Sequence, residues 1–281
     1  MTFLDLPPGH TERTVTDFEG LRLHAWAPRV SQAVIAYFHG LQSHASWSWE
    51  LALDLTARGE TFLCLDRRGS GLSPGPHDEF PEADQVVEDS ARFLRHSLAV
   101  AHGRPVVAVG HCLGGSVLTA TLSRHPEILE QLASMSLVST WLGRMSQTLS
   151  EDQLRSIRDS RDEQVWDAGL RAEDFTAARS YRTFIEEDPL AVTGVRQRTR
   201  KNVLALEDAY RDWTAPPGTS AHFVSAFDDP VIDVRAAART ARRVYGDTTE
   251  VHLLGTDRHY LPFTPARASL VRLLHAQAVH E

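Results

Sequence analysis

Residues 105–122 constrain the fold of this chain more than any other segment, because they predict a strand, a sharp turn and a helix in succession. Residues 105–109 are apolar and mostly β-branched, which is typical of a buried parallel strand. The next six residues read Gly-His-Cys-Leu-Gly-Gly, and glycines on both sides of Cys112 leave room for a backbone that side chains would block. Apolar residues at helical spacing follow. This context predicts that Cys112 sits strained and exposed at the turn, where its thiol can act as a nucleophile.

Strand-like and helix-like patterns alternate along most of the chain, which predicts a mostly parallel sheet with helices on both faces. Residues 11–18 and 21–27 are expected to form an opening hairpin. The further strands are expected at residues 33–38, 61–65, 132–138, 221–225 and 250–254. Apolar stripes predict helices over residues 47–58, 83–101 and 266–278.

Residues 141–215 interrupt this alternation. They are rich in Arg, Asp and Glu, contain no convincing strand, and end at Pro216-Pro217-Gly218. An insertion of this kind between two core strands is best explained as a helical cap over the site. The sequence therefore predicts an α/β core of residues 1–140 and 216–281 and a helical cap of residues 141–215.

Composition limits the classes of partner and compartment. The chain has 281 residues, 42% of them hydrophobic, and a formal net charge of −8, which suits one α/β domain and disfavours nucleic acid and anionic membranes as partners. No apolar run approaches the roughly 20 residues of a membrane-spanning helix, and residues 1–7 lack the pattern of a secretion signal. Cys64 and Cys112 are the two cysteines, and no structural disulfide is expected. We therefore predict a cytoplasmic protein without stable membrane insertion.

Two later segments offer partners for Cys112. His259 stands in a loop after the last expected strand, and an acidic pair, Asp228 and Asp229, follows the strand before it. A Cys–His pair yields thiolate at neutral pH, and a carboxylate fixes the imidazole tautomer. The number of residues after Ser225, which ends the expected strand, favours Asp228 as the acid that orients His259. The Asp-Pro turn that follows favours Asp229 instead. We take Cys112, Asp228 and His259 as the expected catalytic residues.

Backbone amides are expected to stabilise the negative oxygen of a tetrahedral intermediate. Leu113, directly after the cysteine, supplies one amide, and Leu41, in the turn His39-Gly40-Leu41, supplies the other. The histidines and cysteines show neither His-x-x-x-His nor Cys-x-x-Cys spacing, so we expect no metal site and no cofactor.

Together these motifs resemble the monoacylglycerol lipase and lysophospholipase branch of the α/β-hydrolases. The resemblance rests on His39-Gly40, on Asp-Arg-Arg-Gly-Ser-Gly-Leu-Ser at 66–73, on the turn at 110–115 and on Asp-Pro-Leu at 188–190. The order nucleophile, acid, histidine also agrees. The resemblance implies an α/β-hydrolase fold, with a mostly parallel eight-stranded sheet, helices on both faces and an inserted helical cap.

The nucleophile departs from that branch, whose lipase-like members use serine. Cysteine at position 112 is similar to the Cys-His-Asp enzymes that release polyketide or peptide chains from carrier proteins, including Dieckmann cyclases, and to dienelactone hydrolase. A serine-to-cysteine replacement in a serine hydrolase would give the same sequence.

Three hypotheses follow from this comparison. The first is a cysteine-dependent acyl hydrolase, a thioesterase or esterase working through an acyl-Cys112 intermediate. The second is an acyltransferase or Dieckmann-type cyclase that releases a chain from a carrier-protein thioester. The third is a non-catalytic binding protein. The expected partner is a small acyl ester or thioester, with an acyl or peptidyl carrier protein as a further candidate. The basic run at 196–201 is either a solvated helix face or a docking patch for such a carrier.

Overall fold

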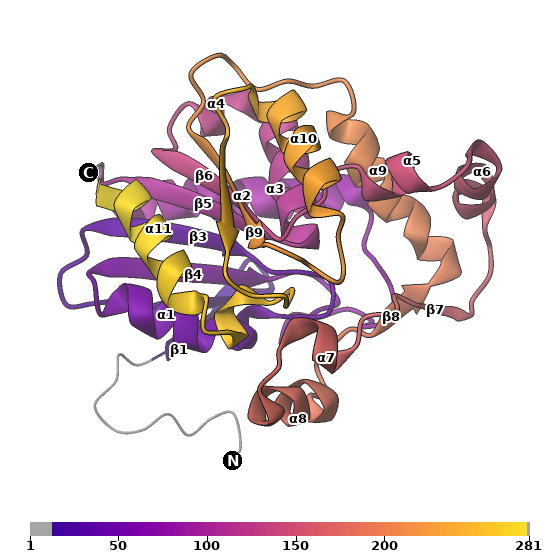
Figure 1. The fold of residues 1–281 in the computed structure, drawn as a ribbon, viewed down its shortest axis with the longest axis horizontal. Helices are drawn as coiled ribbons and strands as arrows, with labels where there is room; N and C mark the ends of the chain where they lie inside the picture. The colour runs from indigo at the N-terminus through magenta and orange to yellow at the C-terminus, as the bar shows by residue number, and fades with distance from the viewer. Residues whose placement is uncertain (1–12, 280–281) are drawn as a thin grey trace.

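The computed structural model describes residues 13–279, and in that range an eight-stranded sheet has the order β1-β2-β4-β3-β5-β6-β9-β10 (Figure 1). The first three strands in this order pair antiparallel and the others pair parallel. The strands are β1 (Arg13–Phe18), β2 (Leu21–Trp26), β3 (Ala33–Phe38), β4 (Glu60–Asp66), β5 (Val106–His111), β6 (Ser134–Val138), β9 (Ala221–Ala226) and β10 (Glu250–Leu254). This arrangement confirms the predicted fold class.

Helices cover both faces of the sheet. One face packs against α2 (Ala83–Ala101), α3 (Leu113–Arg124) and α10 (Val234–Tyr245). The other face packs against α1 (Trp49–Thr56) and α11 (Arg267–Val279). Three short elements complete the core, η1 (Ala45–Ser48), α4 (Pro126–Leu129) and η3 (Leu261–Phe263).

Strand β5 shows why the sheet needs helices on both sides. Val106 and Ala108 join the hydrophobic cluster on the α2–α3 face, whereas Val107 and Val109 join the cluster on the α1–α11 face. Successive side chains of a strand point to opposite faces, so a wholly apolar strand must be covered twice. All four side chains are 0–1% exposed.

Residues 139–220 leave the sheet between β6 and β9, and the helices that they form lie to its right and below it in Figure 1. We call residues 141–215 the inserted segment. Its elements are α5 (Arg144–Thr148), α6 (Glu151–Asp159), β7 (Val165–Asp167), α7 (Ala172–Phe175), α8 (Arg179–Glu187), β8 (Gly194–Arg196), η2 (Gln197–Thr199) and α9 (Arg200–Tyr210). The expectation of helices alone is wrong, because β7 and β8 form a short antiparallel pair. Three-residue strands are too short to show an alternating pattern in sequence.

The expected elements of the core agree with the structure to within a few residues at each end. The opening strand expected at 11–18 is β1, and residues 11 and 12 lie outside the described residues. Helix α10 was not anticipated, although the Asp233 carboxylate caps it by accepting a hydrogen bond from the Ala236 amide at 2.9 Å. No helix among residues 13–279 is long and apolar enough to cross a membrane.

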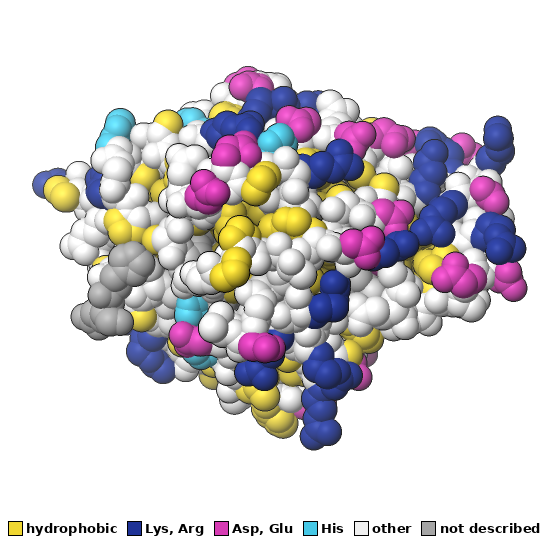
Figure 2. All heavy atoms as spheres, turned by 90° about the horizontal axis from the view of Figure 1, so that it is seen from above, with side chains coloured by type: hydrophobic (Ala, Val, Ile, Leu, Met, Phe, Trp, Pro, Cys, Tyr) yellow, Lys and Arg dark blue, Asp and Glu magenta, His cyan; other side chains and the backbone are white. Residues whose placement is uncertain are grey.

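Basic and acidic side chains lie next to one another on the surface of the inserted segment. Figure 2 shows arginines beside acidic side chains at the right-hand end of the molecule, where Figure 1 places α6. Arg155 pairs with Asp152 at 3.2 Å, and Arg158 pairs with Asp208 of α9 at 3.6 Å. Exposed pairs of this kind contribute little to stability, and the segment instead depends on its buried contacts with the core.

Candidate active site

Four loops converge at the carboxyl edge of the parallel strands. The turn with Gly40 and Leu41 follows β3, and Cys112 follows β5. The loops after β9 and β10 carry Asp229 and His259. Parallel strands present their carboxyl ends at one edge of the sheet, where α/β proteins bind ligands. The order of the strands therefore gathers residues that lie more than 200 positions apart in sequence.

Cys112 lies at the sharp turn between β5 and α3 that the sequence predicts. Its backbone is in the left-handed region, with φ 52° and ψ −120°, a strained conformation for a residue with a side chain. The turn also needs close packing of the backbone. A Cβ at Gly114 would lie 2.1 Å from the Phe38 carbonyl oxygen, and one at Gly110 would lie 2.5 Å from the Cα of Gly115. The glycines therefore allow the backbone of the turn to pack closely against the end of β3 and the start of α3.

Asp229, and not the expected Asp228, is the acid that faces the histidine. Both carboxylate oxygens of Asp229 lie 2.9 Å from His259 Nδ1. The side chain of Asp229 is buried, and its Oδ1 accepts hydrogen bonds from the amides of Val231 and Ile232 at 2.8 and 3.2 Å. Asp228 is exposed. The correction has a local cause: the chain turns just after β9, and the Asp-Pro turn directs Asp229 inward, so counting from the strand end fails.

The charges around Cys112 favour its thiolate. Burial by itself raises the pKa of the Cys112 thiol, but the nearby charge of His259 and the Leu113 amide together lower it below its ordinary value. Burial likewise opposes the charged form of His259, but the Asp229 and Cys112 charges raise the pKa of its imidazole. The Asp229 carboxylate favours a charged His259 imidazole, and the imidazolium in turn favours the Cys112 thiolate. The arrangement therefore favours a thiolate and imidazolium pair backed by a carboxylate.

The turn after β3 lies against the nucleophile. A Cβ on Gly40 would approach the Cβ of Cys112 to 3.2 Å. His39 is buried and braces this turn, because its Nε2 accepts a hydrogen bond from the Arg67 amide at 3.1 Å. This contact gives His39 a structural role. The Leu41 amide follows directly in the chain, on the loop beside Cys112, whereas the Leu113 amide already contacts the sulfur. That these two amides form an oxyanion hole stays a prediction.

The inserted segment contacts the histidine loop directly. The amide of His259 donates to the carbonyl of Asp174 at 2.8 Å, and the amide of Tyr260 donates to the carbonyl of Phe175 at 3.3 Å. The Phe175 ring stands edge-on to the His259 imidazole, with ring centroids 5.7 Å apart. Together these contacts leave His259 0% exposed. Sequence reasoning missed α7, because four residues are too short to show helical periodicity.

A second cluster, also missed, ties the inserted segment to the turn after β3. Asp188 Oδ2 lies 2.9 Å from His44 Nε2 and accepts a hydrogen bond from Trp47 Nε1 at 2.5 Å. Trp47 is fully buried among Phe175, Tyr260 and other aromatic side chains. The structure therefore gives Trp47 a packing role. Asp188 of the Asp-Pro-Leu motif at 188–190 thus holds the inserted segment against the turn after β3.

Removing the Asp188 carboxylate should destabilise the protein. In Asp188→Ala, the buried donor of Trp47 loses its acceptor, which lowers the free energy of unfolding by about 1–3 kcal/mol. The matched control is Glu187→Ala, one residue earlier on an exposed side chain, which we expect to change it by less than about 0.5 kcal/mol. Urea unfolding followed by tryptophan fluorescence measures both. Equal effects of the two substitutions would contradict the role given to Asp188.

The basic run at 196–201 is largely engaged within the protein. Arg196 pairs with Asp78 and Glu163, each at 2.9 Å, and Arg198 pairs with Glu163 at 2.7 Å. The guanidinium of Arg200 stacks 4.1 Å from the Trp166 ring centroid. Arginines held in this way offer little charge to an acidic partner. The structure therefore favours a structural role for this run over a docking patch.

Comparison with known proteins places the chain among hydrolases. A family model described as "Serine aminopeptidase, S33" matches residues 29–265. The probable esterase PIR7A of Oryza sativa subsp. indica is 28% identical over 123 residues, which cover 43% of this chain and 45% of the rice protein. The chain thus matches less than half the length of that relative.

Solved structures share the fold over nearly the whole chain. Monoglyceride lipase of Saccharomyces cerevisiae is 25% identical over 168 residues, 56% of this chain and 52% of the yeast protein. The crystal structure of a soluble variant of it, in complex with a substrate analog, superimposes with a TM-score of 0.78 and 15% identity over 98% of this chain and 97% of that one. A thioesterase domain from the curacin biosynthetic pathway superimposes with a TM-score of 0.62 and 18% identity, covering 94% and 99%.

Proposed function

This chain belongs to the serine aminopeptidase S33 family, whose model matches most of its length, and we propose that it is a cysteine-dependent acyl hydrolase working through an acyl-Cys112 intermediate. The observation that carries the proposal is the row formed by the half-buried Cys112 and the buried His259 and Asp229. It lies at the edge of the sheet where such folds bind substrate. The family membership supports hydrolysis, and the residue at the turn supports a sulfur nucleophile.

The proposed reaction has two halves. The Cys112 thiolate attacks the acyl carbonyl carbon, and the Leu41 and Leu113 amides stabilise the oxyanion that forms. The intermediate collapses by breaking the bond to the leaving group, which takes a proton from the His259 imidazolium. His259, now neutral, removes a proton from water as the water attacks the thioester carbon. Breaking the carbon–sulfur bond then releases the acid and restores the thiolate, while Asp229 keeps the His259 Nδ1 proton in place throughout.

Thioesters should be better substrates than oxygen esters. When a thiolate attacks an oxygen ester, the tetrahedral intermediate can expel either sulfur or alkoxide, and the thiolate leaves more readily because its conjugate acid is the stronger acid. With a thioester, the two possible leaving groups are thiolates of similar pKa. The proposed substrate class is therefore an acyl thioester, carried on a small thiol or on a carrier protein, with alkyl oxygen esters as slower substrates.

A substrate panel tests this proposal. We would measure hydrolysis of acyl thioesters of short and medium chain length, the matching ethyl esters, and amino-acid p-nitroanilides. The proposal predicts that the free acid appears with kcat/KM highest for thioesters and that anilides stay intact. Preferred cleavage of the anilides would favour a peptidase instead. Binding of acyl compounds without any turnover would favour the non-catalytic hypothesis.

Alkylation by iodoacetamide reports directly on the thiolate. Because the pKa of Cys112 is lowered, its labelling rate at pH 7 should exceed that of a free thiol, and should fall only when the pH drops below that lowered pKa. In His259→Ala the charge that lowers the pKa of Cys112 is lost and burial dominates. Labelling at pH 7 should then slow by at least about tenfold, which corresponds to a rise of one pKa unit.

Cys64 is the internal control for the labelling experiment. It is fully buried, and burial raises the pKa of its thiol well above the ordinary value, so Cys64 should stay unlabelled in the folded protein. Peptide mass mapping after labelling at several pH values distinguishes the two cysteines. A labelling rate for Cys112 that follows an ordinary thiol, and that His259→Ala leaves unchanged, would contradict the ion pair.

Acyl transfer to a carbon, amine or alcohol is the second candidate function. The observation that favours it is the burial of His259 under Phe175, which restricts the water available for hydrolysis. In this reaction the acyl-Cys112 carbonyl is attacked by the second nucleophile instead of water, and the thiolate leaves as before. Product identification separates the two functions, because transfer or cyclisation gives a new ester, amide, ring or carbon–carbon bond and no free acid.

A further inference from the structure

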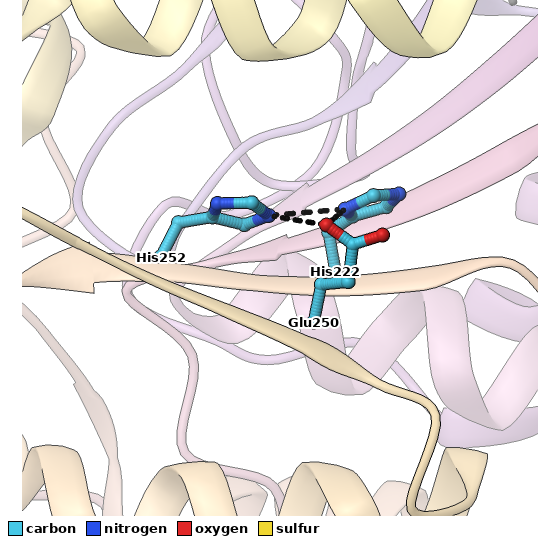
Figure 3. Close-up of side chains that lie close together, drawn as sticks. All are labelled: His222, Glu250 and His252. Carbon is cyan, nitrogen blue, oxygen red and sulfur yellow. Dashed lines mark hydrogen bonds and ion pairs between the residues drawn. The ribbon is translucent and has the colours of Figure 1, made fainter.

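A cluster of two histidines and a glutamate lies on β9 and β10, away from the proposed nucleophile. His222 is the second residue of β9, and Glu250 and His252 are the first and third residues of β10. Figure 3 shows the two imidazole rings and the Glu250 carboxylate pointing toward one another from these two strands. None of these side chains takes part in the reaction proposed above, so the cluster needs an explanation of its own.

The register of the sheet brings the three side chains together. In the parallel pairing of β9 and β10, His222 stands opposite Glu250. Residues two apart on a strand project to the same face, so His252 joins Glu250 on that face. The cluster is therefore fixed by backbone pairing and does not depend on a mobile loop.

The three donor atoms have the spacing of a metal-binding set. His222 Nδ1 lies 3.2 Å from His252 Nε2, Glu250 Oε2 lies 3.3 Å from His252 Nε2, and Glu250 Oε2 lies 3.7 Å from His222 Nδ1. A tetrahedral zinc ion with bonds of about 2.0–2.2 Å holds its donors about 3.3–3.6 Å apart. We propose that His222 Nδ1, His252 Nε2 and a carboxylate oxygen of Glu250 bind a divalent cation of the zinc class.

The donor types select among metals. Two imidazoles and one carboxylate suit Zn²⁺, Ni²⁺, Cu²⁺ and Co²⁺, whereas Mg²⁺ and Ca²⁺ prefer oxygen donors. Each imidazole binds a metal in its neutral form, with its one proton on the ring nitrogen that faces away from the metal. The Glu250 side chain is 63% exposed, which leaves the fourth position open to water.

The position of the cluster points to a structural role. Strand β10 is the edge strand of the sheet, paired on one side to β9 alone. A cation bound by both strands would tie this edge to its neighbour near the start of the two strands. The loops that carry Asp229 and His259 leave from the opposite ends of the same strands. A bound ion would therefore stabilise the frame of the active site without touching its substrate, and this inference stands apart from the proposed function.

Metal binding can be measured on the full chain by equilibrium dialysis against ZnCl₂. We expect about one equivalent to bind at this cluster, and Glu250→Gln, His222→Gln and His252→Gln each to weaken binding by at least about tenfold. Because Glu250 is exposed, Glu250→Gln should fold normally even if a histidine variant does not. The matched control is His125→Gln, which removes a histidine also flanked by glutamates, Glu88 and Glu127, but without a second imidazole.

The thiolate at position 112 is a competing zinc ligand, so every measurement is repeated in Cys112→Ser. The proposal requires that Cys112→Ser still binds one equivalent and that Glu250→Gln in that background weakens it. Binding of Co²⁺ provides a second readout, since a sulfur ligand gives a charge-transfer band that nitrogen and oxygen ligands do not. The proposal is overturned if Zn²⁺ does not bind, if Cys112→Ser alone abolishes binding, or if Glu250→Gln and His125→Gln bind like the wild type.

Discussion

Replacing Cys112 by alanine is expected to lower kcat/KM for acyl thioesters by about 10⁴- to 10⁶-fold, because no other group in the site can form the acyl intermediate. The fold should be retained. Alanine and cysteine are similarly strained at φ 52°, and the turn is held by backbone contacts such as the Cys112 amide to the Val138 carbonyl at 2.9 Å. Steady-state kinetics together with thermal unfolding measure both effects.

Two further variants make this result specific. Cys64→Ala removes the other cysteine, which lies in β4 on the α1–α11 face, and should leave kcat/KM within about threefold. Cys112→Ser keeps a nucleophile of the type found in serine hydrolases, and its turnover should be insensitive to iodoacetamide. If Cys112→Ala retained more than about a tenth of the activity, a sulfur nucleophile at this turn would be ruled out.

Replacing Asp229 by asparagine is expected to lower kcat/KM by about 10³- to 10⁴-fold. The buried carboxylate accepts a hydrogen bond from His259 Nδ1–H and stabilises the imidazolium. An asparagine amide would offer a donor to Nδ1, favour the wrong tautomer of His259 and remove the charge that raises the pKa of the imidazole. The effect should be mainly on kcat, because Asp229 is held behind the histidine and out of reach of the substrate.

Asp228→Asn is the matched control, since it makes the same chemical change one residue earlier. Asp228 is exposed, and its replacement should change kcat/KM by less than about threefold. The labelling rate of Cys112 by iodoacetamide at pH 7 should fall in Asp229→Asn and stay unchanged in Asp228→Asn. A larger loss of activity in Asp228→Asn than in Asp229→Asn would show that the acid assignment read from the structure is wrong.

The turn around Cys112 could be predicted from sequence because its determinants are local. A β-branched strand, glycines where the backbone packs closely, and a helical pattern all fall within 18 residues. The sheet could be predicted for a related reason, since wholly buried strands read as short apolar runs. Each of these signals depends on near neighbours in the chain.

The features that were missed depend on contacts between distant residues. The choice between Asp228 and Asp229 is an exception, because the local Asp-Pro turn already favours Asp229. Asp188 meets His44 across 144 positions of sequence. His222 meets His252 through strand pairing across 30 positions, so a search for His-x-x-x-His spacing could not find the pair. In these two pairs the fold supplies the proximity.

The account depends most on a covalent bond between Cys112 and the acyl group. Mixing the protein with excess acyl thioester, quenching in acid within the first turnovers and measuring the intact mass tests this directly. We predict a mass increase equal to one acyl group, located on the peptide that contains Cys112 and lost as substrate is exhausted. Turnover without this adduct, or an adduct on another residue that persists in Cys112→Ala, would contradict the mechanism.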